Sequence, residues 1–121
     1  MQKLAAREEQ IMLILWRLGK AFVKDIVEEF PEPKPHYNSI STMVRVLQDK
    51  GFIGHTAYGR THQYHPIISQ EEYTNQEVAE VVDKYFDNSF QKMISHFAKE
   101  EKVSSAELEE ILKMIKKGKQ E

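Results

Sequence analysis

Hydrophobic residues recur at helical spacing twice in the first third of the chain. The first pattern predicts a helix over about residues 5–18, and its apolar positions are Leu4, Ile11, Ile14, Leu15 and Leu18. The second pattern predicts a helix over about residues 22–30, with Ile26, Val27 and Phe30 at the same spacing. Prolines at positions 31, 33 and 35 end this helix, because proline lacks the amide hydrogen and clashes with the preceding turn.

A third helix is predicted directly after the prolines. Its buried face combines four apolar residues at positions i, i+3, i+4 and i+7, which are Ile40, Met43, Val44 and Leu47. The opposite face carries Asn38, Thr42 and Arg45, with Ser41 on one side and Val46 on the other. Gly51 then ends the helix, since glycine readily adopts the left-handed conformation that follows many helices.

Two short segments rich in β-forming residues follow, at residues 52–57 and 61–65. The loop between them contains Gly59, which is typical of a β-hairpin. Three helices followed by a hairpin are the order of elements in a winged helix, a variant of the helix-turn-helix. The sequence therefore predicts a mainly α fold with a small β-hairpin wing (α+β), with the winged helix-turn-helix occupying residues 1–68.

The C-terminal part, residues 69–121, carries a second kind of pattern. Ser69 to Glu72 has the composition of a capping box and predicts a helix whose apolar stripe continues to Phe97 without a break. A second capping box at Ser104 to Glu107 predicts a last helix, and residues 99–103 form the gap between the two.

The apolar stripes of these two helices are wider than the helices can bury against each other, so we expect a second copy of the chain to cover them. This part also carries twelve acidic residues against eight lysines, a net charge of −4, which would keep it away from DNA. We therefore interpret residues 69–121 as a helical homodimerisation region. The predicted interface residues are Val82, Phe86, Phe90, Met93, Phe97, Leu108, Ile111, Leu112 and Ile115.

The charge balance of the middle of the chain is the reverse. Between residues 33 and 68 the only acid is Asp49, and the basic residues are Lys34, Arg45, Lys50 and Arg60. The whole chain has a formal net charge of −2, so this positive balance is local and is of the kind that a phosphate-facing surface requires.

The third helix and the wing therefore predict a surface for double-stranded DNA, made of Asn38, Ser39, Ser41, Thr42, Arg45, Val46 and Arg60. Arg45 would fork onto a guanine or clamp a phosphate, and Asn38 would pair with an adenine or a phosphate. Thr42 or Val46 would touch a thymine methyl group. The two serines would bind backbone phosphates near the helix N-terminus, and Arg60 would contact a phosphate or the minor groove. The alternative is that this is an ordinary solvated helix face.

Several classes of function are disfavoured by what the chain lacks. It contains no cysteine, which excludes disulfides, zinc fingers and thiolate metal sensors. His62 and His65 stand three apart in a predicted strand, so they point to opposite faces and make a poor metal-binding pair. No nucleophile elbow, phosphate-binding glycine loop or H-E-x-x-H motif is present, so catalysis, metals and cofactors are not expected.

The sequence also bears on the cellular location of the protein and on alternative functions. No apolar run is long enough to cross a membrane and nothing resembles a signal peptide, so a cytoplasmic location is expected. No small-molecule ligand is expected, because a chain this short has little room for a cavity. The rival interpretations are a winged helix that binds proteins, and a regulator that is controlled by a ligand.

Over nearly its full length the chain resembles the penicillinase repressor family, which includes BlaI, MecI and the copper-responsive CopY branch. The resemblance rests on four segments in order: Arg7 to Trp16, Ser41 to Leu47 with Lys50-Gly51, Tyr64 at the end of the wing, and Ser95 to Lys99 before an acidic turn. It implies a dimeric bacterial repressor with an N-terminal winged helix and a C-terminal helical dimerisation region. We expect such a dimer to bind an inverted-repeat operator, because the two-fold axis of the protein must match that of the DNA.

The resemblance also implies a mode of release. In the β-lactam-responsive branch, an activated membrane-bound sensor protease leads to cleavage of the repressor, which separates dimerisation from DNA binding. The family's scissile bond is typically Asn-Phe, and the corresponding pair here is His96 and Phe97. Relatives often have a basic residue where this chain has Val46, and the copper branch has a C-terminal cysteine motif that this chain lacks.

Overall fold

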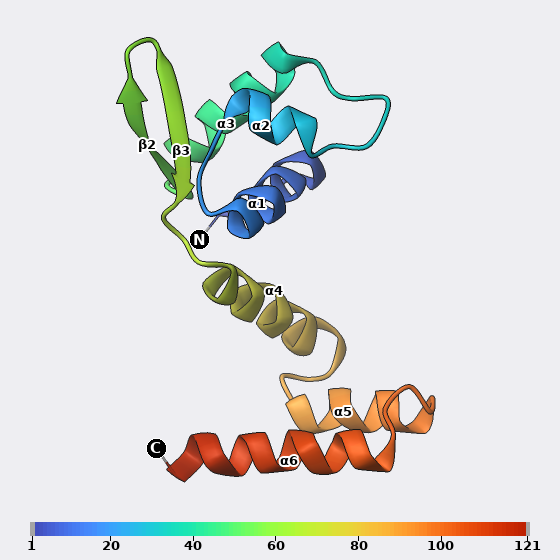
Figure 1. Cartoon of the computed structure of the whole chain (residues 1–121). Helices are drawn as coiled ribbons and strands as arrows, with labels where there is room; N and C mark the ends of the chain where they lie inside the picture. The colour runs from blue at the N-terminus through green and yellow to red at the C-terminus, as the bar shows by residue number, and fades with distance from the viewer. Residues whose placement is uncertain (1, 121) are drawn as a thin grey trace. The chain divides into compact units, whose positions relative to one another are not determined.

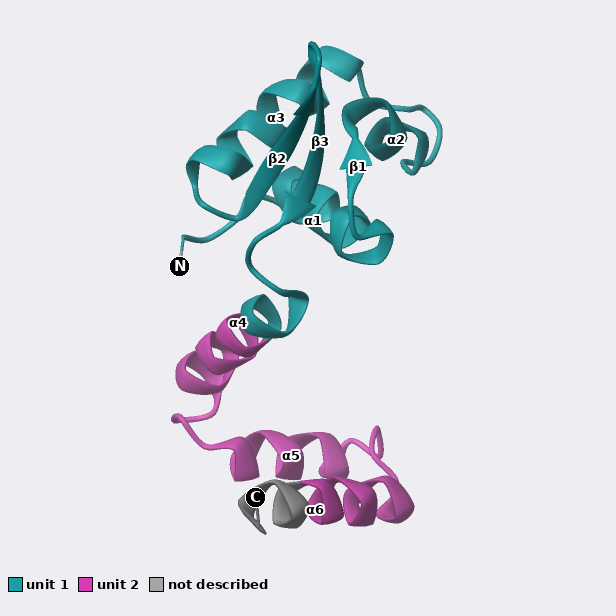
Figure 2. Cartoon of the chain, turned by 60° about the vertical axis from the view of Figure 1, so that its left-hand side comes forward, with its two compact units in different colours: residues 1–74 teal, residues 75–121 magenta. Residues whose placement is uncertain are grey.

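The computed structural model describes residues 2–120, with side chains as far as Met114. The chain divides into two compact units, residues 1–74 and 75–121 (Figure 2). The elements of the first unit, in order, are α1 (Ala6–Leu18), β1 (Ala21–Phe22), α2 (Val23–Glu28), α3 (Tyr37–Asp49), β2 (Ile53–Tyr58) and β3 (Thr61–Pro66) (Figure 1). The helices α4 (Gln70–Tyr85), α5 (Phe90–Lys99) and α6 (Ser105–Gln120) follow.

The first unit packs three helices against a three-stranded antiparallel sheet with the strand order β1-β3-β2. Its core is formed by residues that are at most 1% exposed, namely Ile11, Met12, Leu15, Ile26, Ile40, Val44, Leu47, Phe52 and Ile53. The predicted helices over residues 5–18 and after the prolines are confirmed, and so is the hairpin. The buried face of the first helix differs slightly from the predicted one: Met12, which was not predicted, is buried, whereas Leu18, which was predicted, is 36% exposed.

The predicted second helix is confirmed, but it starts one residue later than expected and ends at Glu28 instead of Phe30. Ala21 and Phe22 form the short strand β1, in which Ala21 pairs with Tyr64 and Phe22 pairs with Gln63. The helix α2 begins only at Val23, where the Asp25 carboxylate accepts a hydrogen bond from the backbone N–H of Phe22 at 3.0 Å. A strand of two residues has no period of its own, so its pairing with the wing is invisible in the pattern of one segment.

One ion pair joins the start of α1 to the end of α3. Glu8 is only 7% exposed, and its two carboxylate oxygens accept hydrogen bonds from Lys50 Nζ at 2.9 and 3.0 Å. The backbone N–H of Ala5 donates to the same carboxylate at 2.8 Å. Burial raises the pKa of Glu8, but the hydrogen bonds from Ala5 and Lys50 and the lysine charge outweigh it, so the pKa lies below its ordinary value of 4.5.

The fold is therefore expected to lose stability in acid through Glu8. Because its pKa is lowered by folding, the carboxylate stabilises the folded state above about pH 4.5, and this contribution is lost as the pH falls through the lowered pKa. Glu8→Gln should reduce the free energy of unfolding by about 1–3 kcal/mol near neutral pH. Urea unfolding at neutral pH and at about pH 3 should show this difference shrinking in acid. The control Glu28→Gln, at an exposed position of α2, should show no such change, and a Glu8→Gln deficit that is independent of pH would contradict the assignment.

The capping boxes that the sequence predicts at the starts of α4 and α6 are both confirmed. The Glu72 N–H donates to Ser69 Oγ at 3.1 Å, and the Ser69 N–H donates to Glu72 Oε1 at 3.2 Å. Ser104 and Glu107 repeat this reciprocal pair with distances of 3.1 and 3.2 Å. Local sequence therefore sets where these helices begin.

The first turn of α4 belongs to the first unit. Tyr73 is 5% exposed, its ring lies 5.6 Å from that of Trp16 and 6.0 Å from that of Phe52, and its hydroxyl donates to Glu9 Oε2 at 2.8 Å. The indole N–H of Trp16 donates to the carbonyl oxygen of Ile68 at 2.9 Å. These contacts hold the chain that leaves the wing against α1, which is why the first compact unit extends to residue 74.

The single helix predicted from Ser69 to about Phe97 is instead two helices, α4 and α5. Asp87 and Asn88 have φ values of 52° and 58°, in the left-handed region that short polar side chains tolerate better than most. Ser89 then caps α5 by accepting a hydrogen bond from the Lys92 N–H at 3.2 Å. The apolar period continues through this break, and for that reason periodicity alone missed the turn.

Candidate nucleic-acid interface

The polar face that the sequence predicts on the third helix is exposed on α3. Arg45 and Asn38 face solvent and Val46 is 38% exposed, whereas Ser41 is half-buried. We use the term recognition face for Asn38, Ser39, Ser41, Thr42, Arg45 and Val46. It lies opposite the fully buried residues Ile40, Val44 and Leu47, so the core fixes which side of the helix faces outward.

Thr42 makes a hydrogen bond within the helix that limits what it can offer to a base. Its hydroxyl donates to the carbonyl oxygen of Asn38, four residues earlier, at 2.9 Å. The hydroxyl hydrogen is thus already used, which leaves an acceptor oxygen and the methyl group. With the neighbouring Val46, Thr42 is therefore suited to contact with a thymine methyl group.

The N-terminus of α3 has no side chain that caps it. The N-cap residue is His36, which makes no capping hydrogen bond, and the first turn contains no acidic residue. The free N–H groups and the positive end of the helix dipole favour an anion at this end. Ser39, predicted as a phosphate contact, is exposed in this first turn.

The wing carries Arg60 at its tip. Tyr58 pairs with Thr61 across the turn, so the loop consists of Gly59 and Arg60 alone. Gly59 has a φ of 62°, a conformation that residues with a side chain rarely adopt, which explains glycine at this position. The Arg60 side chain is exposed, as a contact with DNA beside the recognition helix would require.

A recess of about 150 Å³ lies between α3 and the wing. We call it the arginine recess, and its lining residues are Val23, Tyr37, Ser41, Arg45, Arg60, Thr61, His62 and Tyr64. Burial raises the pKa of the Tyr64 hydroxyl, the positive charge of Arg45 lowers it, and Tyr37 raises it, with a net increase. The Tyr64 hydroxyl is thus neutral at ordinary pH and lies within the electrostatic reach of Arg45.

Sequence reasoning named Ser41, Arg45 and Arg60 but missed four polar residues that share the recess with them: Tyr37, Thr61, His62 and Tyr64. One signal was present in the sequence, since Tyr37, Ser41 and Arg45 stand four residues apart and so follow one line along a helix. The contribution of the wing depends on how the hairpin packs beside α3, which no local pattern encodes.

Two of the four basic residues between residues 33 and 68 are used inside the fold. Lys50 is paired with Glu8, and Lys34 Nζ donates to the carbonyl oxygens of Glu28 and Phe30 at 2.8 and 3.0 Å. The other two, Arg45 and Arg60, make no salt bridge within the part of the chain that the structure describes. Both line the arginine recess, so the available positive charge of this segment is concentrated there.

The histidines of the wing form a stack rather than a metal site. The rings of His55 and His62 are stacked with centroids 4.1 Å apart, and Gln48 Oε1 lies 3.0 Å from His55 Nδ1. His65 lies instead beside Gly54, its partner on β2. Among the described residues, no three histidine, aspartate or glutamate side chains are grouped so that they could hold a metal ion.

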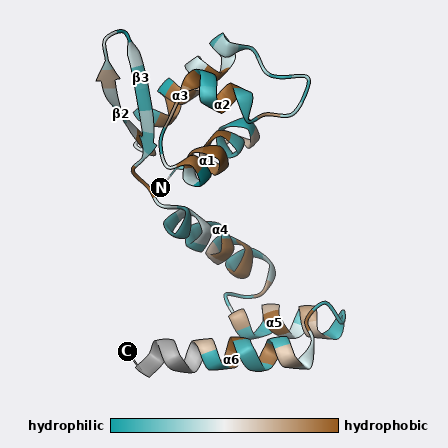
Figure 3. Ribbon diagram, viewed as in Figure 1, coloured by the Kyte–Doolittle hydropathy of each residue, from teal (hydrophilic) through white to brown (hydrophobic). Residues whose placement is uncertain are grey.

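The last three helices expose several large hydrophobic residues. None of the residues of α5 is buried, and among the described side chains of the three last helices the exposed large hydrophobic residues are Val78, Val81, Tyr85, Phe90, Phe97, Leu112 and Met114. Figure 3 shows hydrophobic residues on all three of these helices.

The predicted interface residues fall into four groups in the structure. Phe90, Phe97 and Leu112 are exposed, whereas Phe86, Met93, Leu108 and Ile111 are half-buried. Val82 is 0% exposed and is therefore covered within its own chain. The side chain of Ile115 lies outside the described residues.

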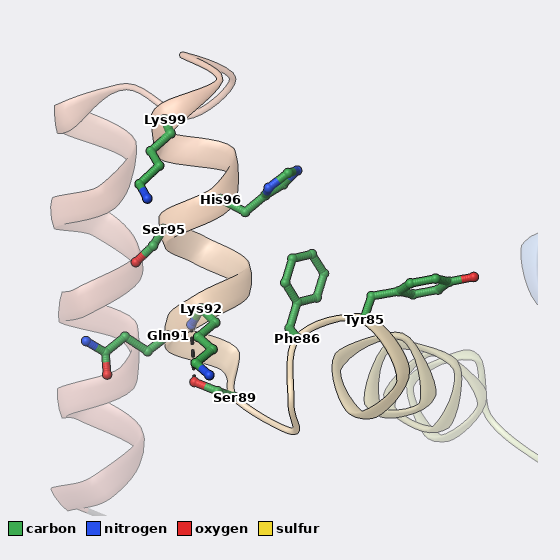
Figure 4. Close-up of a pocket in the computed structure, with 8 residues that line it drawn as sticks. All are labelled: Tyr85, Phe86, Ser89, Gln91, Lys92, Ser95, His96 and Lys99. Atoms are coloured by element: carbon green, nitrogen blue, oxygen red, sulfur yellow. Dashed lines mark hydrogen bonds between the residues drawn. The ribbon is translucent and has the colours of Figure 1, made fainter.

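An open recess of about 500 Å³ lies along α5 in the second unit (Figure 4). Phe86 and His96 face each other on one side of the helix with their ring centroids 5.6 Å apart. Lys92 also lines the recess, and its Nζ is paired with Asp87 at 2.9 Å. The recess adjoins the His96–Phe97 pair, where the family resemblance placed the cleavage site.

The arrangement of the first unit, with an exposed recognition face beside a wing, is that of a winged-helix repressor domain. The solved structure of the DNA-binding domain of the repressor BlaI matches it with a TM-score of 0.51 and 25% identity, over 60% of this chain and 94% of that one. The penicillinase repressor family model matches residues 4–117. The chain belongs to the penicillinase repressor family.

Individual relatives are similar along almost their whole length. The chain is 23% identical over 116 residues to the methicillin resistance regulatory protein MecI of Staphylococcus aureus (strain N315), covering 95% of this chain and 94% of the relative. It is 20% identical over 113 residues to the penicillinase repressor of Bacillus licheniformis, covering 93% and 88%. Family and fold together make the chain a DNA-binding transcriptional repressor. No described helix is both long and apolar enough to cross a membrane.

Proposed function

We propose that the chain acts as a homodimer and represses transcription by binding an inverted-repeat operator, with the recognition face of each copy in a major groove. The observation that carries this proposal is the exposed recognition face of α3 beside a wing that carries Arg60. The surface carries polar and basic side chains of the kinds that form hydrogen bonds with base edges and phosphate oxygens. Asn38, Thr42 and Val46 would contact base edges, and Ser39 would bind a phosphate at the free N-terminus of α3.

A single copy of the chain offers few positive charges to DNA, so tight binding requires a dimer. With Lys34 and Lys50 used internally, one recognition face offers few cations, and we expect its affinity to lie near the non-specific range of roughly 10⁻⁴ to 10⁻⁶ M. A second copy joined through the last three helices would raise avidity by about 10²–10⁴. The exposed residues Phe90, Phe97 and Leu112 supply apolar surface for this contact.

We further propose that a sensor protease at the membrane ends repression by cutting at His96–Phe97, as the family resemblance implies. This bond lies within α5, where the His96 carbonyl oxygen accepts a hydrogen bond from the Glu100 N–H at 3.2 Å. Because such a carbonyl must be freed before a protease can hold it, cleavage would act on a locally opened α5. Loss of the chain beyond this bond would remove α6 from the dimer, reduce avidity and release the promoter.

A footprint on the DNA that flanks the gene tests the proposal. We expect the intact protein to protect two symmetric half-sites whose centres lie about one or two helical turns apart, because the two-fold axis of the dimer must match that of the DNA. Protection should weaken steeply as salt is raised. A single unsymmetric protected site, or no protection in low salt, would contradict it.

A further inference from the structure

We propose that the arginine recess holds a backbone phosphate of the bound DNA and that Arg45 contacts this phosphate rather than a guanine. This inference rests on the proposed function and decides between the two partners, a guanine or a phosphate, that the sequence leaves open for Arg45. It divides the recognition face into residues that bind the phosphate backbone of the DNA and residues that contact its bases.

The geometry of the recess fits an anion at the side of the helix. Tyr37, Ser41 and Arg45 approach it from α3 at four-residue spacing, and Arg60, Thr61 and His62 approach it from the wing. Apart from Val23 of α2, the residues that line this recess of about 150 Å³ all have polar side chains, and most of them carry a hydroxyl or a guanidinium group. These are the groups that bind phosphate oxygens in protein–DNA complexes.

The charges point to the same ligand. Arg45 and Arg60 both line the recess, and no acidic side chain lines it. Two cations that share a recess repel each other, and neither forms a salt bridge among the described residues. An anion between them would remove this repulsion and would receive hydrogen bonds from both guanidinium groups.

The position of the Arg45 side chain separates it from the residues that read bases. Arg45 lines the recess together with Arg60, Thr61, His62 and Tyr64 of the wing, so its side chain borders the gap between α3 and the wing. Base edges lie on the floor of the major groove, and the phosphates lie along its rims. An arginine that borders this gap is placed for the rim, which leaves base reading to Asn38, Thr42 and Val46.

The test measures the affinity of the intact protein and of Arg45→Ala for the footprinted operator and for a scrambled duplex, each over a series of salt concentrations. We expect the substitution to weaken both by the same factor, about tenfold, and to reduce the slope of log K against log salt by about 1. Arg45→Lys should restore most of the slope, because it keeps the charge. Tyr37→Phe, which removes one hydroxyl, should weaken both duplexes equally and leave the slope unchanged.

Arg17→Ala is the matched control, because Arg17 is an exposed arginine paired with Glu29 outside the recess, and it should change neither affinity nor slope. A loss confined to the operator, with the slope unchanged, would make Arg45 a base contact and overturn the inference while leaving the proposed function intact. Unchanged affinity of Arg45→Ala for both duplexes would also overturn it. If the intact protein shows no salt-dependent binding to either duplex, the proposed function itself fails.

Discussion

A chain that ends after Ser95 is expected to be largely monomeric and to bind the operator about 10²–10⁴-fold more weakly than the intact protein. It lacks Phe97 and the whole of α6, and with them three of the seven exposed large hydrophobic residues described on the last helices, Phe97, Leu112 and Met114. Each recognition face would then bind alone, without the effective concentration that a linked partner supplies. Sedimentation velocity and titration of a labelled operator measure the two effects.

The control for this prediction is built into the chain. Trp16 is its single tryptophan, and its indole N–H donates to the Ile68 carbonyl oxygen within the first unit. Unchanged tryptophan emission would show that the winged helix of the shortened chain is intact, so that weak binding reports lost dimerisation. A tight dimer formed by the shortened chain would rule out release by cleavage at His96–Phe97.

Leu47→Ala should reduce the free energy of unfolding by about 2–5 kcal/mol, because the side chain is fully buried and its removal leaves a cavity between α3 and the rest of the core. The core face of α3 also determines which residues face outward, so the recognition face depends on this packing. Urea unfolding followed by tryptophan fluorescence measures the loss.

Leu13→Ala provides a comparison with the same side chain in a different environment. Leu13 lies on α1 and is 47% exposed, so its truncation should change the free energy of unfolding by no more than about 0.5 kcal/mol. Equal losses from the two substitutions would mean that the core is not arranged as described.

Features set by neighbours in sequence were predictable. Ile40, Val44 and Leu47 share one face at helical spacing, and their burial confirms the orientation of α3. The two capping boxes formed as predicted, because a serine and a glutamate three residues apart need only each other's backbone. Gly59 marked the hairpin for a similarly local reason.

Features that depend on contacts between distant segments were not predictable. Ala21 and Phe22 form a strand only because β3 lies beside them. Lys50 is not available to bind DNA, because it is paired with Glu8, which is distant in sequence but near in the fold. The break between α4 and α5 is a different case, since Asp87 and Asn88 followed by Ser89 have the composition of a turn and a cap. These residues indicated the turn correctly, but the apolar stripe continues through them, and the prediction of one long helix followed the stripe.

In the candidate site, too, the local sequence predicted some features and only the packing of distant segments showed the others. Periodicity alone located the outward residues of α3, but only the packing of the wing showed that Arg45 and Arg60 share one recess. The contacts between two copies of the chain remain a prediction, supported by exposed apolar residues such as Phe90 and Leu112.

The most direct test of the account is the number of protein chains on one operator. Sedimentation equilibrium of the intact protein with a duplex that carries both half-sites should give two chains per duplex. A duplex cut to one half-site should bind far more weakly under the same conditions. One chain bound per duplex, with equal affinity for the whole operator and for its half, would contradict the claim that repression needs two joined copies.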